Sequence, residues 1–480
     1  MASSYSERLS AVDAAFLEIE DENCPMHVGA VAIFDAAPLT RPEGGIDIDR
    51  IRDLVAALLV PRYRQRIARI PLTNHPVWVD DARFNLHYHL RHLSLPAPGD
   101  DRQLKRLAGH VMSLPLDRNK PLWELWVVEG VSDDRFAIFS KTHHCMMDGV
   151  GSADLMVTAM GTHPSDTAVK PKRWRPRPAP TPLELIAGEL RRNLGGGGAA
   201  LRAAAHALTQ PRRNAEALRD ALTGVGEAFR AGFQQASPTP FNVQIGPHRR
   251  FDWLRFELAQ VKEVKKQLGG TVNDVVLATV AGALRRFLRR RGENIAKLDF
   301  RAMLPVNIRT QNESGAFGNR VTMMTAELPL DERNPRKRLQ HVIETTRELK
   351  ASKQARGVEI LEEMGELGPP SLFAQLARLT AVVRPFNVIV TNVPGPQFQT
   401  YLLGAPLVEA YPLVPLYRNQ ALGIALFSYN GGLFWGLNAD WDAVPDLHDL
   451  VADLVTEFEA LRNAAEGATL KHKDGKQSCS

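Results

Sequence analysis

The sequence predicts an α/β fold organised in two domains, and three patterns support this prediction. Short apolar runs of strand length alternate with helical patterns in both halves of the chain. A segment rich in proline and glycine separates the two halves. With 480 residues, of which 44% are hydrophobic, the chain is long enough for two domains and a large core.

The N-terminal half alternates between patterns typical of strands and of helices. We expect a strand over 26–35, a helix over 48–60 and a strand over 122–130. The mostly apolar run from Phe136 indicates a further buried strand that ends near Thr142. A helix is expected to start around Ser152, after a turn at Gly149 and Gly151.

The C-terminal half shows the same mixture. Helices are expected over 273–291 and 336–352, where apolar residues recur at helical spacing. Strands are expected near 300–309, 387–393 and 421–438. No internal sequence repeat accompanies these patterns.

Residues 171–246 are expected to connect the domains. They open with the proline-rich stretch PKRWRPRPAPTP, contain four consecutive glycines at 195–198, and carry eleven basic but only five acidic residues between 171 and 235. Such a basic, partly helical linker either rests on anionic lipid headgroups or packs on the domains as a solvated helical hairpin. We therefore divide the chain into an N-terminal domain (1–170), this linker, a C-terminal domain (247–465) and a polar tail (466–480) expected to be disordered.

Composition excludes several other classes of protein. The three cysteines, Cys24, Cys145 and Cys479, are too few for a disulfide framework, and the first residues lack the pattern of a secretory signal. No apolar run is long enough to span a bilayer, so we expect a cytoplasmic protein whose contact with membrane is peripheral. A net charge of +5 favours anionic partners, but no nucleic-acid-binding motif is present, and nucleic acid is not expected as a partner.

The segment FAIFSKTHHCMMDG, residues 136–149, is the strongest functional signal. Adjacent strand residues point to opposite faces, so His143 and His144 cannot both reach one substrate. We assign general-base catalysis to His144 and a structural, hydrogen-bonded role to His143. Asp148 is expected to shape the site around His144, and Gly149 to allow the turn that follows. This arrangement suits attack of an alcohol on a thioester.

Two other interpretations of this segment are less well supported. A zinc site would need the two diverging imidazoles to converge, and the cysteines show no paired-ligand spacing, so no metal is expected. Cys145 is a candidate acyl-enzyme nucleophile, but as the neighbour of His144 it should point away from that imidazole.

Several landmarks together resemble the bacterial wax ester synthase/acyl-CoA:diacylglycerol acyltransferase family. They are PLWE at 121–124, HHCMMDG at 143–149, Asn273-Asp274, PVNIR at 305–309 and NVPGP at 392–396, and the segment LSAVDAAFLEIEDENCPMHVGAVAIFD near the N-terminus is similar as well. The resemblance extends from about Leu9 to Leu461. It implies two chloramphenicol-acetyltransferase-like domains with the active site in a channel at their interface.

The resemblance also implies the reaction. The expected activity is transfer of a long acyl chain from acyl-CoA to diacylglycerol, a fatty alcohol or both, with acyl-CoA as substrate and no bound cofactor. The expected location is the surface of the inner membrane or of lipid droplets.

The same resemblance suggests roles for further residues. Asp148 is expected to hold its loop, with Arg309 as a candidate partner. Asn273 either orders the active site and stabilises the oxyanion, or simply caps a helix.

Other landmark residues are expected along the substrate channel. Trp123 is expected in the core or in the channel wall, and Asn392, Pro394 and Gly395 beside the channel, the last two shaping a turn. Met147 belongs to a motif centre bulkier than is usual in the family, which bears on the channel width.

Two alternative functions remain open at this stage. The same histidine motif serves condensation-type or ester-forming enzymes whose acyl donor is tethered to a carrier protein. A protein that only binds or organises neutral lipid on the same fold is the other alternative, although intact His144, Asp148 and Gly149 argue against it.

Overall fold

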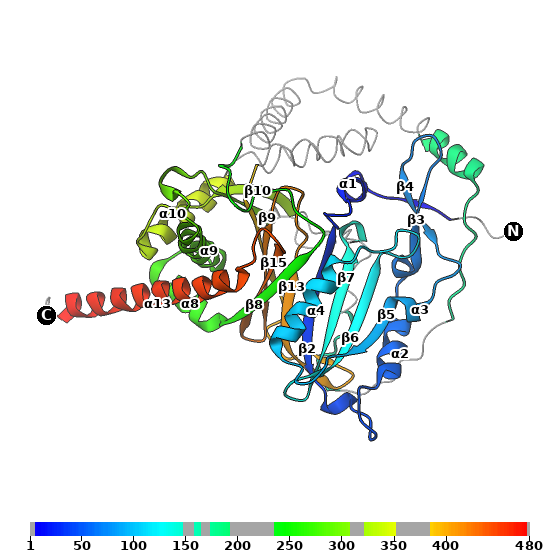
Figure 1. Cartoon of the computed structure of the whole chain (residues 1–480), viewed down its shortest axis with the longest axis horizontal. Helices are drawn as coiled ribbons and strands as arrows, with labels where there is room; N and C mark the ends of the chain where they lie inside the picture. Colours follow the sequence, from blue (N-terminus) through cyan, green and yellow to red (C-terminus); the bar gives the residue numbers. More distant parts are fainter. Residues whose placement is uncertain are drawn as a thin grey trace, which may run out of the picture.

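The computed structural model describes residues 5–146, 158–164, 173–192, 235–307, 321–351 and 385–477. Its architecture is α/β, with two six-stranded sheets side by side and helices packed around them, as expected (Figure 1). The helix predicted around Ser152 and most of the linker lie outside the described residues.

The first sheet has the strand order β12-β13-β2-β7-β6-β5. A three-stranded sheet, β1-β4-β3, lies beside it. The elements of this half are β1 (Glu7–Arg8), α1 (Ala11–Ile19), β2 (His27–Asp35), η1 (Ala37–Leu39), α2 (Ile48–Leu58), η2 (Pro61–Arg64), β3 (Gln65–Arg69), β4 (Pro76–Asp80), α3 (Leu86–His89), β5 (Leu90–Ser94), α4 (Asp101–Ser113), β6 (Trp123–Val131), β7 (Arg135–His143) and η3 (His144–Met146).

The second sheet has the order β10-β9-β11-β14-β15-β8. Figure 1 shows α9, α10 and α13 on the side of this sheet that faces away from the first sheet. The elements are β8 (Arg249–Glu257), α8 (Leu258–Leu268), α9 (Val272–Arg290), η4 (Ile295–Lys297), β9 (Arg301–Asn307), β10 (Val321–Glu327), α10 (Pro335–Ala351), β11 (Val388–Pro394), β12 (Tyr401–Leu402), β13 (Ala405–Leu413), β14 (Leu422–Tyr429), β15 (Gly432–Asp440) and α13 (Leu447–Gln477).

Local chemistry explains why the main elements begin and end where they do. Helix α4 starts in a capping box, in which Asp100 and Gln103 each accept a backbone N–H of the other. The hairpin between β14 and β15 turns at Asn430 and Gly431, both with positive φ, which suits the tight turn between twisted strands. The strands and helices predicted in both halves are confirmed, apart from the segments outside the described residues.

Strands β12 and β13 correct the expected division of the chain. They belong to the segment assigned to the C-terminal domain, yet β13 pairs antiparallel with β2 in the first sheet. The local sequence pattern could not show this, because pairing between distant segments leaves no trace in periodicity. The pairing covers the edge of β2, which would otherwise present unpaired backbone groups.

Helix α13 continues to Gln477, into the segment 466–480 that we assign from the sequence to a polar tail. Residues 466–477 contain no proline and include alanine, glutamate and lysine, which favour a helix.

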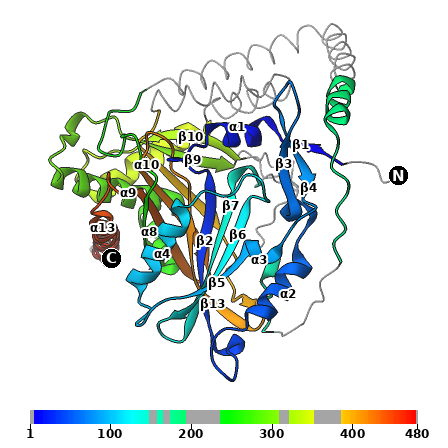
Figure 2. The same cartoon turned by 45° about the vertical axis from the view of Figure 1, so that its right-hand side comes forward.

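The two halves pack closely against one another in the views of Figures 1 and 2, with α4 next to β8. Gly109 of α4 has no side chain, and a Cβ there would clash with the backbone carbonyl of Arg249 on β8. Trp253 of β8 stacks on Tyr411 of β13, with ring centroids 4.7 Å apart. The interface is therefore built from backbone approach as well as from aromatic packing.

Candidate active site

The histidine pair lies where β7 ends and the 3-10 turn η3 begins. His143 is the last residue of the strand, pairs with His27 on β2, and its backbone N–H donates to the carbonyl of Leu122. His144 is the first residue of the turn, and its backbone N–H donates to the carbonyl of Met26 at 2.8 Å. The end of β7 is thereby fixed on both sides by main-chain hydrogen bonds.

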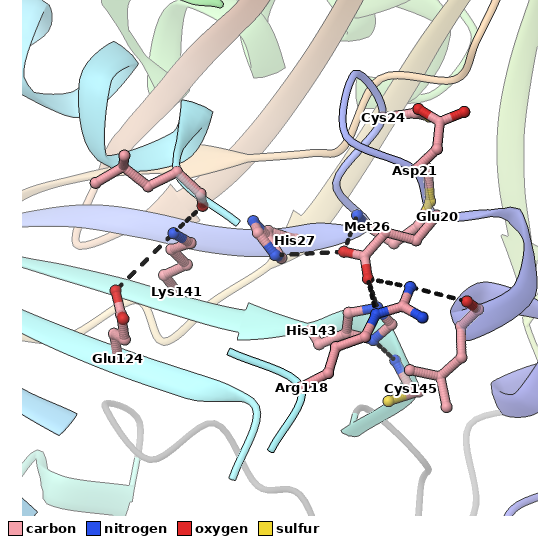
Figure 3. A network of polar contacts seen from close by, with 12 residues as sticks. Glu20, Asp21, Cys24, Met26, His27, Arg118, Glu124, Lys141, His143 and Cys145 are labelled. Carbon is pink, nitrogen blue, oxygen red and sulfur yellow. Dashed lines mark hydrogen bonds and ion pairs between the residues drawn. The ribbon is translucent and has the colours of Figure 1, made fainter. Parts of the chain in front are cut away.

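His143 is fully buried and occupied by protein contacts, as Figure 3 shows. Its Nδ1 accepts the backbone N–H of Cys145 at 3.1 Å, and its Nε2 lies 3.4 Å from Oε2 of Glu20. An imidazole held in this way orients the turn and has no free nitrogen for a substrate.

His144 differs from His143 in its burial and in its contacts. It is only half-buried, and its ring stacks on Phe16 of α1 with centroids 3.9 Å apart. Burial, together with repulsion from His143, lowers the pKa of His144 from 6.5 to about 4. The imidazole is therefore neutral at physiological pH, the form that accepts a proton.

Phe16 places this histidine at the junction of the two halves. Its ring packs against the hydrophobic core of the first sheet and against that of the second. The loop after α1 also reaches the hydrophobic core of the second sheet. Met26 is fully buried in that core, and Cys24 Sγ contacts the carbonyl of Leu416 at 3.1 Å. His144 thus lies beside the interface of the two halves.

Glu20 organises the buried polar groups around His27 and His143 (Figure 3). Its carboxylate accepts hydrogen bonds from Arg118 and from the backbone N–H of Met26, and lies 3.5 Å from Nε2 of His27. Burial alone would raise the pKa of Glu20, but the contacts with His143, His27 and Arg118 outweigh it and hold the pKa at about 2. Glu20 is therefore a permanent anion under His143.

Lys141 is the second charge buried in this region and has no exposed surface. Its ammonium group donates to the carbonyls of Val111 and Leu114 at the C-terminal end of α4, and lies 3.9 Å from Glu124. Burial lowers the pKa of Lys141 to about 8. This lysine ties α4 to the strand that carries the histidines.

Cys145 is fully buried, and burial raises the pKa of its thiol well above the usual value. A thiol in this state is a poor nucleophile, which agrees with the expectation that Cys145 does not form an acyl-enzyme. Within the described ranges, no group of three His, Cys, Asp or Glu side chains is placed to hold a metal ion.

The structure separates the two interpretations of Asn273. The N-cap of α9 is Thr271, whose hydroxyl accepts the backbone N–H of Asp274, while the Asp274 carboxylate accepts the N–H of Thr271. Interpreting Asn273 as the N-cap is therefore wrong, since Thr271 and Asp274 have the spacing of a capping box. Asn273 is half-buried and makes no hydrogen bond to His144.

The remaining predicted site residues are placed as follows. Trp123 is in the core, where its indole donates to the carbonyl of Tyr63 at 2.7 Å and stacks on His89. Asn392 is half-buried on β11.

Pro394 ends the strand β11 and does not form a turn. Gly395 continues the pairing by donating to the carbonyl of Ser428 at 2.9 Å, and a Cβ there would clash with the ring of Phe427. Met147, Asp148, Gly149 and Arg309 lie outside the described residues.

Sequence reasoning missed Phe16, Glu20 and His27 as members of the site. All three belong to the N-terminal segment that carried part of the family resemblance, and that resemblance was the only sequence signal for them. Their distance along the chain from His143 and His144 leaves no local pattern.

Comparison with solved structures shows which class of protein this architecture defines. The structure resembles a trichothecene 15-O-acetyltransferase from Fusarium sporotrichioides (TM-score 0.58, 12% identity, 95% of each chain), which at this identity supports the fold alone. It is more similar to the wax ester synthase/diacylglycerol acyltransferase from Marinobacter aquaeolei VT8, with a TM-score of 0.68 and 26% identity over 96% of this chain and all of that one. The fold is thus that of the chloramphenicol-acetyltransferase-like acyltransferases.

Sequence comparison identifies the family within this class. The wax ester synthase/diacylglycerol acyltransferase catalytic domain matches residues 9–276, and the C-terminal domain of the same family matches 317–462. "Putative diacylglycerol O-acyltransferase Rv1760" of Mycobacterium tuberculosis is 34% identical over 92% of this chain and 87% of that protein. The chain belongs to the wax ester synthase/diacylglycerol acyltransferase family and is an acyltransferase.

Proposed function

We propose that the protein transfers a long acyl chain from acyl-CoA to the free hydroxyl of diacylglycerol, and also to fatty alcohols, with His144 as general base. The names of its relatives support the acceptors. The observation that carries the mechanism is the contrast between the two histidines. His143 is buried with both ring nitrogens in contact with protein groups, whereas His144 is half-exposed and its side chain makes no hydrogen bond to another described residue.

In the proposed reaction the neutral imidazole of His144 takes the proton of the acceptor hydroxyl as its oxygen attacks the thioester carbonyl. The tetrahedral intermediate then collapses, the carbon–sulfur bond breaks, and the imidazolium returns the proton to the departing thiolate of coenzyme A. Both substrates are bound together, and the reaction uses no bound cofactor or metal.

Other residues support this reaction in the proposal. The N–H groups of the Asn273 side chain stabilise the oxyanion of the intermediate. Asp148 holds the loop after His144, with Arg309 as its partner. Asn392 and Met147 contribute to the walls along which the acyl chains lie.

We also propose that the enzyme works at the surface of the inner membrane or of lipid droplets. Its acceptors are apolar lipids that reside there. Across the described residues, no helix is both long and apolar enough to cross a bilayer, so the proposed contact is peripheral. Part of the basic linker contacts the N-terminal domain. Arg177 makes two side-chain hydrogen bonds to Asp80 of β4, and its backbone N–H donates a third.

Coenzyme A release from palmitoyl-CoA tests the proposal. The purified protein is given diacylglycerol, hexadecanol or no acceptor, in parallel with His144→Ala and with the control His87→Ala, an exposed histidine of α3. Release that depends on acceptor, persists in the control and falls by about 10² to 10⁴ in His144→Ala is the expected result. Release unaffected by His144→Ala would contradict the mechanism. No release with either acceptor would favour a carrier-bound donor or a lipid-binding role.

A further inference from the structure

A basic cavity lies at the far end of α9, between that helix, the start of α10 and α13. Its volume is about 480 Å³, within the range of small-molecule sites. Eight charged residues line it: Arg285, Arg286, Arg289, Arg290, Arg333, Arg338, Asp453 and Glu457. Six are basic and two acidic, so the lining carries a net charge of +4.

The floor of this cavity is a fixed structure. Arg338 is 1% exposed, forms an ion pair with Glu457, and donates from Nε to the carbonyl of Ala278 at 3.1 Å. Gly282 of α9 makes room for the pair, because a Cβ there would clash with both side chains. The arginine fork is therefore held in place before any ligand arrives.

Both acidic groups are already engaged by arginines. Glu457 also contacts Arg286, and Asp453 pairs with Arg290 at 2.7 Å. Three arginines of the lining remain, Arg285, Arg289 and Arg333, and none of these forms a hydrogen bond or close ion pair with any residue that the structure describes. Half of the positive charge in the cavity thus has no counter-ion among the residues that the structure describes.

Arg285 is the buried member of these three arginines, since Arg289 and Arg333 are exposed. Its side chain is only 8% exposed, and its buried Nε has no hydrogen-bond partner within the described part of the chain. Burial lowers its pKa, and repulsion from Arg289, Arg333 and Arg338 lowers it further. A buried guanidinium nitrogen without a hydrogen-bond partner is costly unless an anion satisfies it.

We propose that this cavity binds a phosphate monoester through Arg285, Arg289 and Arg333. A dianion offsets two of the four excess positive charges, and guanidinium forks bind phosphate oxygens in pairs. The lining has no apolar or aromatic side chain, so it holds a compact anionic group and neither an acyl chain nor a nucleobase. The ligand is either the headgroup of phosphatidic acid or a soluble phosphate ester.

The cavity is distinct from the proposed acyl-transfer site. Arg285 follows Asn273 by twelve residues on the same helix, which corresponds to roughly 18 Å along its axis. Helices α9, α10 and α13 lie on the side of the second sheet that faces away from the first sheet, whose strand β7 ends at His143 (Figure 1). Substitutions in the cavity should therefore leave acyl transfer unchanged.

Calorimetric titration with inorganic phosphate and sedimentation with vesicles test this site. The vesicles are phosphatidylcholine with or without phosphatidic acid. Arg289→Gln and Arg333→Gln remove exposed, unpaired arginines, so the fold should persist. Arg285→Gln is the third variant, and Arg336→Gln on α10 is an exposed control of the same charge that does not line the cavity. Far-ultraviolet circular dichroism and coenzyme A release check that each variant is folded and active.

We expect wild type and the Arg336→Gln control to bind phosphate equally, and each cavity variant to bind roughly tenfold more weakly. Binding to phosphatidic acid vesicles that follows the same order would identify a lipid headgroup, while phosphate binding without vesicle binding would identify a soluble ester. Absence of both kinds of binding, or equal losses in the control, would overturn the proposal.

Discussion

Oε2 of Glu20 lies 3.4 Å from Nε2 of His143, the residue that precedes the proposed base His144. Because Glu20 also anchors Arg118 and the backbone of Met26, and Met26 in turn accepts the backbone N–H of His144, one carboxylate fixes both histidines. The site therefore depends on Glu20 as well as on the proposed base itself.

Glu20→Gln should lower both stability and turnover. The change removes the charge that balances Arg118, and we expect a loss of about 2 to 3 kcal/mol in the free energy of unfolding. A small shift of His144 would lower kcat by about 10²-fold with little change in KM. Glu18→Gln is the matched control on the same helix, because its pair with Arg69 is partly exposed and should contribute less than about 1 kcal/mol. Equal effects of both changes would contradict this role for Glu20.

The stability lost in Glu20→Gln should depend on pH. The folded-state pKa of Glu20, about 2, is below its unfolded value of 4.5, so its stabilising effect is complete above pH 4.5 and is lost as pH falls toward 2. The stability difference between wild type and Glu20→Gln, measured by urea unfolding, should therefore shrink over that interval. A difference that stays constant down to pH 2 would show that the charge does not matter.

The pH dependence of acyl transfer should report the pKa of His144. With that pKa near 4, kcat/KM should stay flat from pH 8 to about 5 and fall tenfold per unit only below pH 4. A base with the ordinary histidine pKa of 6.5 would already lose activity below that value. A break near pH 6.5 in initial rates would contradict the lowered pKa and the neutral state described for His144.

Folding must be checked in the same experiment, because other buried histidines respond to acid as well. Burial lowers the pKa of His75 and of His89 from 6.5 to about 4. The unfolded chain binds protons first, so the free energy of unfolding decreases as pH falls from 6.5 toward 4. Short assays after a pH jump, with circular dichroism at each pH, separate this loss from titration of the base.

Thr271→Ala should lower stability, whereas Asn273→Ala should lower the rate of acyl transfer. Thr271 caps α9, so its loss should cost about 1 kcal/mol of stability with little change in rate. Asn273 caps nothing, and its loss should leave the thermal midpoint unchanged while kcat falls by about 10² to 10³ if it stabilises the oxyanion. Normal kcat in Asn273→Ala would remove it from the mechanism.

Lys141→Met should destabilise the N-terminal half. The variant leaves the terminal carbonyls of α4 and the buried Glu124 without their shared cation, at a cost of about 3 kcal/mol. Lys266→Met, an 80% exposed lysine, should change stability by less than about 0.5 kcal/mol. Chemical unfolding of both variants measures the difference, and similar midpoints would show that Lys141 is not needed to hold α4.

The sequence predicted those features that depend on neighbouring residues. Alternation along β7 was enough to place His143 and His144 in different surroundings, and helical spacing located α9 and α10. Contacts across the chain could not be predicted in this way. Glu20 meets His143, and Phe16 meets His144, only because α1 folds back over the end of β7. Nothing in the local pattern indicated that either residue belongs to the site.

The exchange of β13 into the first sheet bears on how substrates enter. A strand hydrogen-bonded to β2 links the halves covalently and through a backbone ladder, so they cannot swing apart like two lobes on a hinge. Acyl donor and acceptor must be admitted by rearrangement of loops and side chains. For the same reason, a gene cut at the linker would yield an N-terminal fragment with the bare edge of β2 exposed, prone to self-association until the other fragment supplies its strand.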